Sequence, residues 1–116
     1  MINSWNEKEK KRRIKQIPVA YKNEEELSRL IGFLNRKGYT GDAKGSGPRA
    51  VYLDLMKKTY HRPSVMVMAC WCSGRNRYPL TVDQFMENFV RIVIDDDADF
   101  YNELLRKRYE ERHSSR

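Results

Sequence analysis

The stretch that decides the fold covers residues 50–72 and reads AVYLDLMKKTYHRPSVMVMACWC. Every second residue from Val51 to Leu55 is apolar, which is the period of a strand that buries one face. The end of the stretch is apolar at every position, as in a strand that is buried on both faces. We therefore expect an antiparallel hairpin of residues 50–56 and 64–72, joined by a basic, turn-forming loop.

Helices are expected before and after this hairpin. Asn23 is a good N-cap, acidic residues follow it, and apolar residues from Leu27 to Leu34 repeat at helical spacing. Thr81 and Gln84 have the spacing of a capping box, which opens a second helix. The expected helices cover residues 24–37, 82–94 and 98–112.

The order of these elements predicts the α+β class, with a small antiparallel sheet packed by helices. The chain has 116 residues, the size of one domain. We expect this domain to span residues 18–112. A basic helical arm over residues 1–17, with no apolar stripe, precedes it, and a frayed tail over 113–116 follows.

Charge is distributed unevenly along the sequence. The chain carries 23 Lys and Arg against 16 Asp and Glu, a formal charge of +7. By segment, the sequence sums to +5 over residues 1–22, +6 over 44–80 and −5 over 81–99. A polarised surface of this kind steers a charged partner.

The basic clusters predict a non-catalytic nucleic-acid-binding domain. Lys and Arg neutralise phosphates, and neighbouring tyrosines can stack on unpaired bases. RNA or single strands are favoured over duplex DNA, because no expected helix is basic enough to read a groove. The candidate contacts come from the arm, three loops and their aromatic neighbours: Lys10, Lys11, Arg12, Arg13, Lys44, Arg49, Lys57, Lys58, Tyr60, Arg62, Arg75, Arg77 and Tyr78.

Two other functions fit the same sequence. A domain with separate basic and acidic faces suits a regulator that binds another protein, such as an inhibitor of a nucleic-acid enzyme or of a defence system, of the kind mobile elements encode. Alternatively, His61 beside lysine and arginine residues could act as the base of a small ribonuclease that needs no metal.

No metal, cofactor or membrane segment is assigned. Cys70 and Cys72 have no second cysteine pair to complete a zinc site. The glycine-rich loop over residues 40–48 lacks the P-loop motif, and the aspartates of segment 95–99 fit no calcium motif. No run of about 18 apolar residues is present. We expect a cytoplasmic protein without a cofactor.

Overall fold

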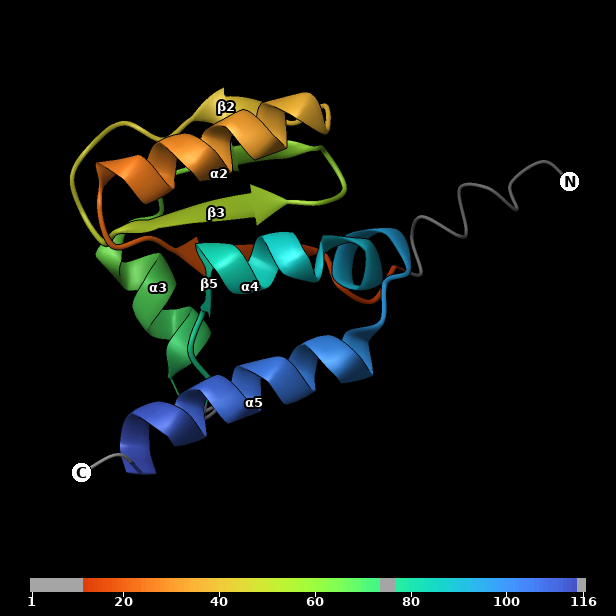
Figure 1. The fold of residues 1–116 in the computed structure, drawn as a ribbon. Coiled ribbons are helices and arrows are strands. Elements are labelled where there is room, and N and C mark those ends of the chain that lie inside the picture. The colour runs from red at the N-terminus through yellow and green to blue at the C-terminus, as the bar shows by residue number, and fades with distance from the viewer. Residues whose placement is uncertain (1–11, 74–76, 115–116) are drawn as a thin grey trace, which may run out of the picture.

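The fold is taken from a computed structural model, which describes residues 12–73 and 77–114 (Figure 1). The helix expected in the arm and the candidate residues Lys10, Lys11 and Arg75 lie outside the described residues. In chain order the elements are β1 (Gln16–Ala20), α2 (Glu24–Arg36), β2 (Thr40–Asp42), β3 (Ala50–Asp54), β4 (Thr59–His61), α3 (Val65–Cys72), β5 (Leu80–Thr81), α4 (Val82–Glu87), a π-helical turn η1 (Val90–Ile94), and α5 (Ala98–Ser114).

The strands form one mixed sheet in the order β2-β4-β3-β1-β5. Strand β3 is antiparallel to both β1 and β4, whereas β2 runs parallel to β4 and β5 runs parallel to β1. The α+β class is therefore confirmed. The prediction of a small antiparallel sheet was wrong, because two short parallel strands extend it at its edges.

The expected partner of residues 50–56 is also corrected. Strand β3 pairs with β4, after a tight turn in which Lys58 has a φ of 57°. Residues 65–72 form α3, because the Ser64 hydroxyl caps the helix by accepting from the Val67 amide at 3.1 Å. A short segment that is apolar at every position has no period to separate a strand from a helix.

Strand β1 lies where the sequence predicted the end of a helical arm. Ile17 and Val19 are fully buried and point into the core, and the strand pairs with β3 on one side and β5 on the other. The Asp96 carboxylate holds the chain just before β1, since it accepts from the amides of Arg13 and Ile14, both at 2.8 Å.

The other expected helices are confirmed, with one subdivision. Residues 24–37 correspond to α2 and residues 98–112 to α5, while the segment 82–94 divides into α4 and η1. The capping box of Thr81 and Gln84 is formed, with both bonds at 3.1 Å. None of the helices formed by the described residues is long and apolar enough to cross a membrane.

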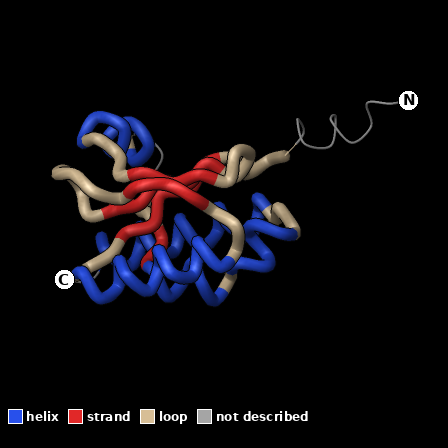
Figure 2. The backbone as a smooth tube through the Cα atoms, turned by 90° about the horizontal axis from the view of Figure 1, so that it is seen from above, coloured by secondary structure: helices blue, strands red, loops and turns tan. Residues whose placement is uncertain are grey.

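The helices are divided unequally between the two faces of the sheet. Helices α2, α4 and α5 form a layer on one face, and α3 stands on the opposite face (Figure 2). Val51 and Leu53 of β3 point into the helical layer and are fully buried there with Leu30 and Phe85. One short helix cannot cover the opposite face, so part of the sheet remains open, and we call this the open face.

Candidate functional site

The open face presents two aromatic rings side by side. Because side chains alternate along a strand, Tyr52 and His61 lie on the face opposite the buried Val51, Leu53 and Tyr60. The two residues are register partners, and their ring centroids are 5.7 Å apart in an edge-to-face arrangement. His61 is exposed and Tyr52 is half-buried. The pair offers an aromatic surface to solvent on a rigid strand.

The open face is hollowed where α3 crosses it. A hollow of about 560 Å³ is lined by Gln16 and Tyr52 from the strands and by residues of α3 that include Met66 and Trp71. The Tyr52 hydroxyl donates to Gln16 Oε1 at 3.1 Å, which fixes both side chains at its floor. Burial raises the pKa of the Tyr52 phenol, so the hydroxyl is protonated at neutral pH.

Arg77 forms the wall of this hollow beside α3. Its guanidinium lies 3.8 Å from the centroid of the Trp71 ring, and its Nε donates to the Trp71 carbonyl at 2.8 Å. Stacking and a hydrogen bond together hold the cation in one place. A positive charge therefore stands next to the aromatic rings of the open face.

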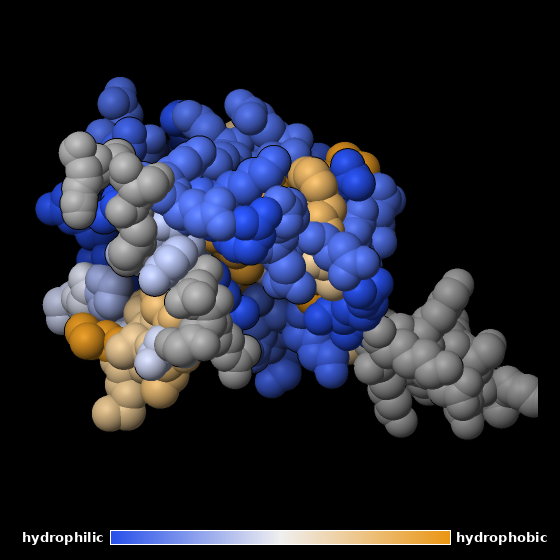
Figure 3. All heavy atoms as spheres, turned by 90° about the horizontal axis from the view of Figure 1, so that it is seen from below, coloured by the Kyte–Doolittle hydropathy of each residue, from blue (hydrophilic) through white to orange (hydrophobic). Residues whose placement is uncertain are grey.

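Helix α3 carries an apolar surface that faces solvent. Val65, Met66 and Val67 are 68%, 74% and 38% exposed, and Trp71 is the residue of this helix that is buried. Figure 3 shows a patch of apolar residues at one corner of the molecule, with a smaller group on the other side of the same view. Exposed apolar patches of this kind mark contact with a ligand or a partner.

A group of cations borders the other end of the open face. Arg62 follows His61 directly and donates to the carbonyls of Pro48, Gly47 and Gly45, which holds the glycine-rich loop in place. Nearby, Arg49 donates to the Lys22 carbonyl at 2.9 Å. Carbonyl oxygens carry no formal charge, so these bonds fix the guanidinium groups without neutralising them. Arg62 itself lines the groove between α2 and β2, on the helical side of the sheet. We therefore call Lys22 and Arg49 the cationic rim.

The basic residues at the start of the described chain have a different role. Arg12 donates to the carbonyls of Ile14 and Val93, and Arg13 forms an ion pair with Asp99 at 3.1 Å. Arg12 and Arg13, from the positively charged segment, therefore pack against part of the negatively charged segment 81–99. Arg12 and Arg13 hold the N-terminal strand in place, and Arg13 also lines a small hollow beside Gln16 and Trp71.

Two further candidate residues lie on the helical side of the sheet. Tyr60 is 5% exposed and donates to Asn35 of α2 at 2.8 Å, so its ring belongs to the core and is closed to a base. Lys58 lies over the ring of the buried Tyr39. Its neighbour Lys57 is exposed in the same turn, close to Asp54 on the open face.

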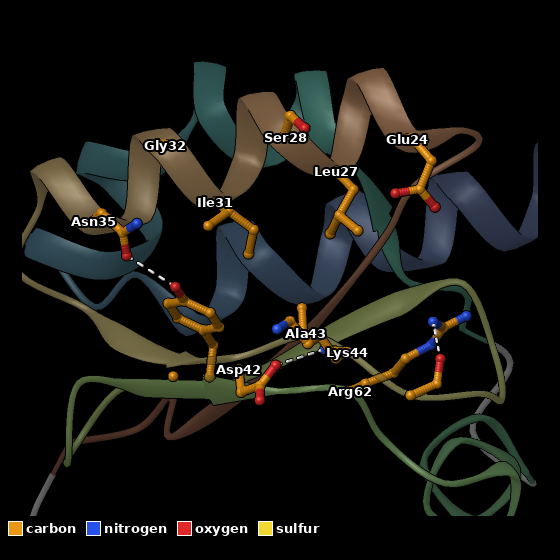
Figure 4. A pocket seen from close by; sticks show the side chains of 13 residues that line it. Glu24, Leu27, Ser28, Ile31, Gly32, Asn35, Asp42, Ala43, Lys44 and Arg62 are labelled. Atoms are coloured by element: carbon orange, nitrogen blue, oxygen red, sulfur yellow. Dashed lines mark hydrogen bonds between the residues drawn. The ribbon is translucent and has the colours of Figure 1, made fainter.

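The remaining candidates are spread over other surfaces. Tyr78 packs against Tyr109 of α5, and Arg112 lies 4.8 Å from its ring centroid. Lys44 is exposed beside a groove of about 610 Å³ between α2 and β2. Figure 4 shows this groove, in which Leu27 and Ile31 point down from α2. Its walls bring acidic Glu24 and Asp42 next to basic side chains, which suits a phosphate backbone less well than the open face does.

The structure also brings in residues that the sequence did not single out. Tyr52 and Gln16 lie at the centre of the open face, and Trp71 supports Arg77. The alternation of β3 contains the signal for Tyr52, because it places that ring opposite the buried Val51 and Leu53. Gln16 and Trp71 had no such signal, since the predicted sheet did not include residue 16 and residues 64–72 were predicted as a strand.

The acidic segment before α5 has a structural role, and the two cysteines form no disulfide. Asp97 caps α5 by accepting from the Phe100 amide at 3.2 Å, and it pairs with Arg91 at 2.9 Å, a bond that lowers the pKa of its carboxyl. Within the described residues, no group of three or more His, Cys, Asp or Glu side chains could hold a metal ion. Cys70 and Cys72 are both free thiols.

Comparison with protein-family models, with curated proteins and with solved structures finds no match for this chain.

Proposed function

We propose that this protein binds single-stranded nucleic acid, RNA in particular, on the open face of its sheet, without catalysis. The observation that carries the proposal is the ring pair of Tyr52 and His61, which stands on an exposed strand surface with Arg77 beside it and the cationic rim at the end of the sheet. Bases of a single strand stack on such rings whatever their sequence, while cations contact the backbone.

The arrangement favours a flexible strand over a duplex. The rings lie on the face of a five-stranded sheet, which is wider than the α-helix or two-stranded ribbon that the major groove of DNA admits. A single strand can turn its bases toward the rings and its phosphates toward the cationic rim and Lys57, which lie at opposite ends of β3 and β4. The protein would thus contact mainly the backbone of the nucleic acid, and two or three bases would stack on the rings between these contacts.

The experiment is fluorescence anisotropy with a labelled uridine 12-mer, the matching DNA and a duplex of the same length. We expect the single strands to bind more tightly than the duplex and the affinity to fall with salt. His61→Ala should weaken binding about tenfold, because stacking on one ring is lost. Thr59→Ala is the matched control, since Thr59 lies two residues earlier on the same strand without a ring.

Two outcomes contradict the proposal. An unchanged affinity of the His61→Ala variant removes the ring pair from the interface, and the absence of binding to every polynucleotide removes the function. If the RNA is cut and His61→Ala abolishes the cutting, the ribonuclease hypothesis replaces it.

The exposed apolar surface of α3 favours a second candidate, a regulator that binds another protein. Val65 and Met66 are the most exposed of the large apolar residues in the described helices, ahead of Val90 and Ile94 of η1, and apolar patches at a surface commonly mark protein contacts. Under this alternative the polynucleotides do not bind, and a protein partner stays attached after a lysate has been treated with nuclease.

The compartment we propose is the cytoplasm. Cys70 is exposed and Cys72 half-buried, and both are free thiols. Exposed free thiols persist in a reducing compartment, where RNA is also abundant.

A further inference from the structure

A buried hydroxyl without a partner adjoins the hollow beside α3. Tyr101 of α5 is 5% exposed, and its hydroxyl has no hydrogen-bond partner within the described part of the chain. Leaving a buried donor unsatisfied costs about 1–3 kcal/mol, so the position calls for an explanation. The ring lines a small hollow of about 120 Å³ that shares Gln16, Trp71 and Arg77 with the larger one.

The polar groups around these two adjoining hollows are mostly hydrogen-bond donors. Gln16 uses its Oε1 to accept from Tyr52, which leaves its amide nitrogen as the donor end. Arg77 is a fixed guanidinium, and the Trp71 carbonyl already accepts from it. Burial raises the pKa of the Tyr101 phenol, which stays protonated and able to donate. The hollow therefore complements a ligand rich in acceptors.

The remaining walls are apolar and suit the faces of a flat ring. Met66, Val67 and Cys70 of α3 line one side, opposite Tyr52. A hollow of this size, apolar with a few convergent polar groups, is typical of a small-molecule site. Among the bases, guanine presents two adjacent acceptors, O6 and N7, that match a guanidinium fork.

We propose that the two adjoining hollows together bind one unstacked guanine of the bound strand, with Arg77, which lines both, at its O6/N7 edge and Tyr101 of the smaller hollow as a further donor. The inference rests on the proposed function and adds a base preference to it. Stacking on Tyr52 and His61 provides affinity for any sequence, and the hollow beside α3 selects one base at one position.

The test uses the full chain and labelled uridine nonamers with guanosine, adenosine or 7-deazaguanosine at the fifth position. Wild-type protein should bind the guanosine nonamer about tenfold more tightly than the adenosine one. The 7-deaza analogue lacks the N7 acceptor and should lose most of that gain.

The decisive variant is Tyr101→Phe, which removes one hydroxyl and keeps the ring. It should bring guanosine and adenosine nonamers to within about twofold of each other and leave binding of the all-uridine nonamer unchanged. Tyr21→Phe is the matched control, because Tyr21 carries the other buried hydroxyl without a partner among the described residues and does not line either hollow. Both variants should melt no lower than wild type, since each loses an unsatisfied group.

The outcomes separate the two proposals. Equal binding of all nonamers by wild type overturns the guanine site and leaves single-strand binding intact. A guanosine preference that survives in Tyr101→Phe overturns the role of Tyr101. No binding of any nonamer overturns the proposed function and the guanine site with it.

Discussion

A side chain at position 41 would collide with the neighbouring strand. Gly41 of β2 pairs with Tyr60 of β4, and a Cβ added at Gly41 would lie 1.9 Å from the Tyr60 carbonyl oxygen. The obstacle is backbone and cannot rotate away. Gly41→Ala should therefore lower the free energy of unfolding by about 2 kcal/mol or more, measured by urea denaturation.

Gly32 provides the matched control for this substitution. It lies inside α2, where a Cβ would meet the Arg36 side chain at an ordinary 3.5 Å. Alanine has the higher helix propensity, so Gly32→Ala should raise the free energy of unfolding by up to about 1 kcal/mol. If both variants lose stability equally, the close approach of β2 and β4 does not explain the effect at Gly41.

At the scale of elements, how far the sequence predicted the fold depended on periodicity. Helix α2 combines an N-cap, an acidic first turn and a regular apolar face, and each signal indicates the same structure. Helix α3 lacks that agreement, because its eight residues are apolar throughout and include two valines. The signal that decides it is Pro63-Ser64, since the serine caps the helix and its apolar face stays in solvent.

The candidate site was predicted only in part for the same reason. Arg77 was found from composition and lies beside the open face, whereas Arg62, found in the same way, lines the groove on the helical side. The hollow beside Arg77 depends on β1 and α3 meeting across the sheet. β1 contains a proline, which is depleted in strands, and contacts between distant segments leave no local pattern.

The cap of α5 gives this helix a dependence on pH. The hydrogen bond from Arg91, followed by that from the Phe100 amide, lowers the pKa of Asp97 below its ordinary value of 3.8. A lowered pKa in the folded state means that the ionised carboxylate stabilises the fold above that value, and that this contribution is lost as the pH falls through the folded pKa. Asp97→Asn should therefore melt below wild type at pH 7, by circular dichroism, chiefly because the ion pair with Arg91 is lost.

The difference between wild type and Asp97→Asn should shrink steadily as the pH falls below 3.8. Asp95→Asn is the control, because Asp95 is exposed and its carboxylate makes no hydrogen bond to the described residues. A gap between Asp97→Asn and wild type that stays constant down to low pH would show that its loss of stability has a cause other than the ionised carboxylate.

At the scale of the whole molecule, acidic residues gather on the helical layer. Between residues 12 and 114, Asp42 and Asp54 are the acidic residues that lie on strands, and the others lie on α2, α4, α5 or the turns joining them. Several of these carboxylates are paired with arginines of the same layer, as in Arg29–Asp83 and Arg91–Asp97. Among residues 12–73 and 77–114, the strand side therefore retains most of the positive excess.

This distribution predicts how binding responds to salt. Each backbone phosphate neutralised on a single strand adds about 0.7 to the slope of log affinity against log salt. Lys22 of the cationic rim and Lys57 of the β3–β4 turn are exposed at opposite ends of the open face. Lys22→Gln and Lys57→Gln should each reduce the slope for a uridine 12-mer by about 0.7, and the double variant by about twice that amount.

Lys107→Gln separates this local effect from net charge. Lys107 is exposed on α5 in the helical layer, so the substitution removes the same formal charge at a distance from the open face. We expect its salt slope to equal that of wild type, because a charge beyond about one Debye length, ~8 Å in physiological salt, is largely screened. If all three variants reduce the slope equally, the strand is held by the overall positive charge; if only Lys22→Gln and Lys57→Gln do so, it runs across the open face.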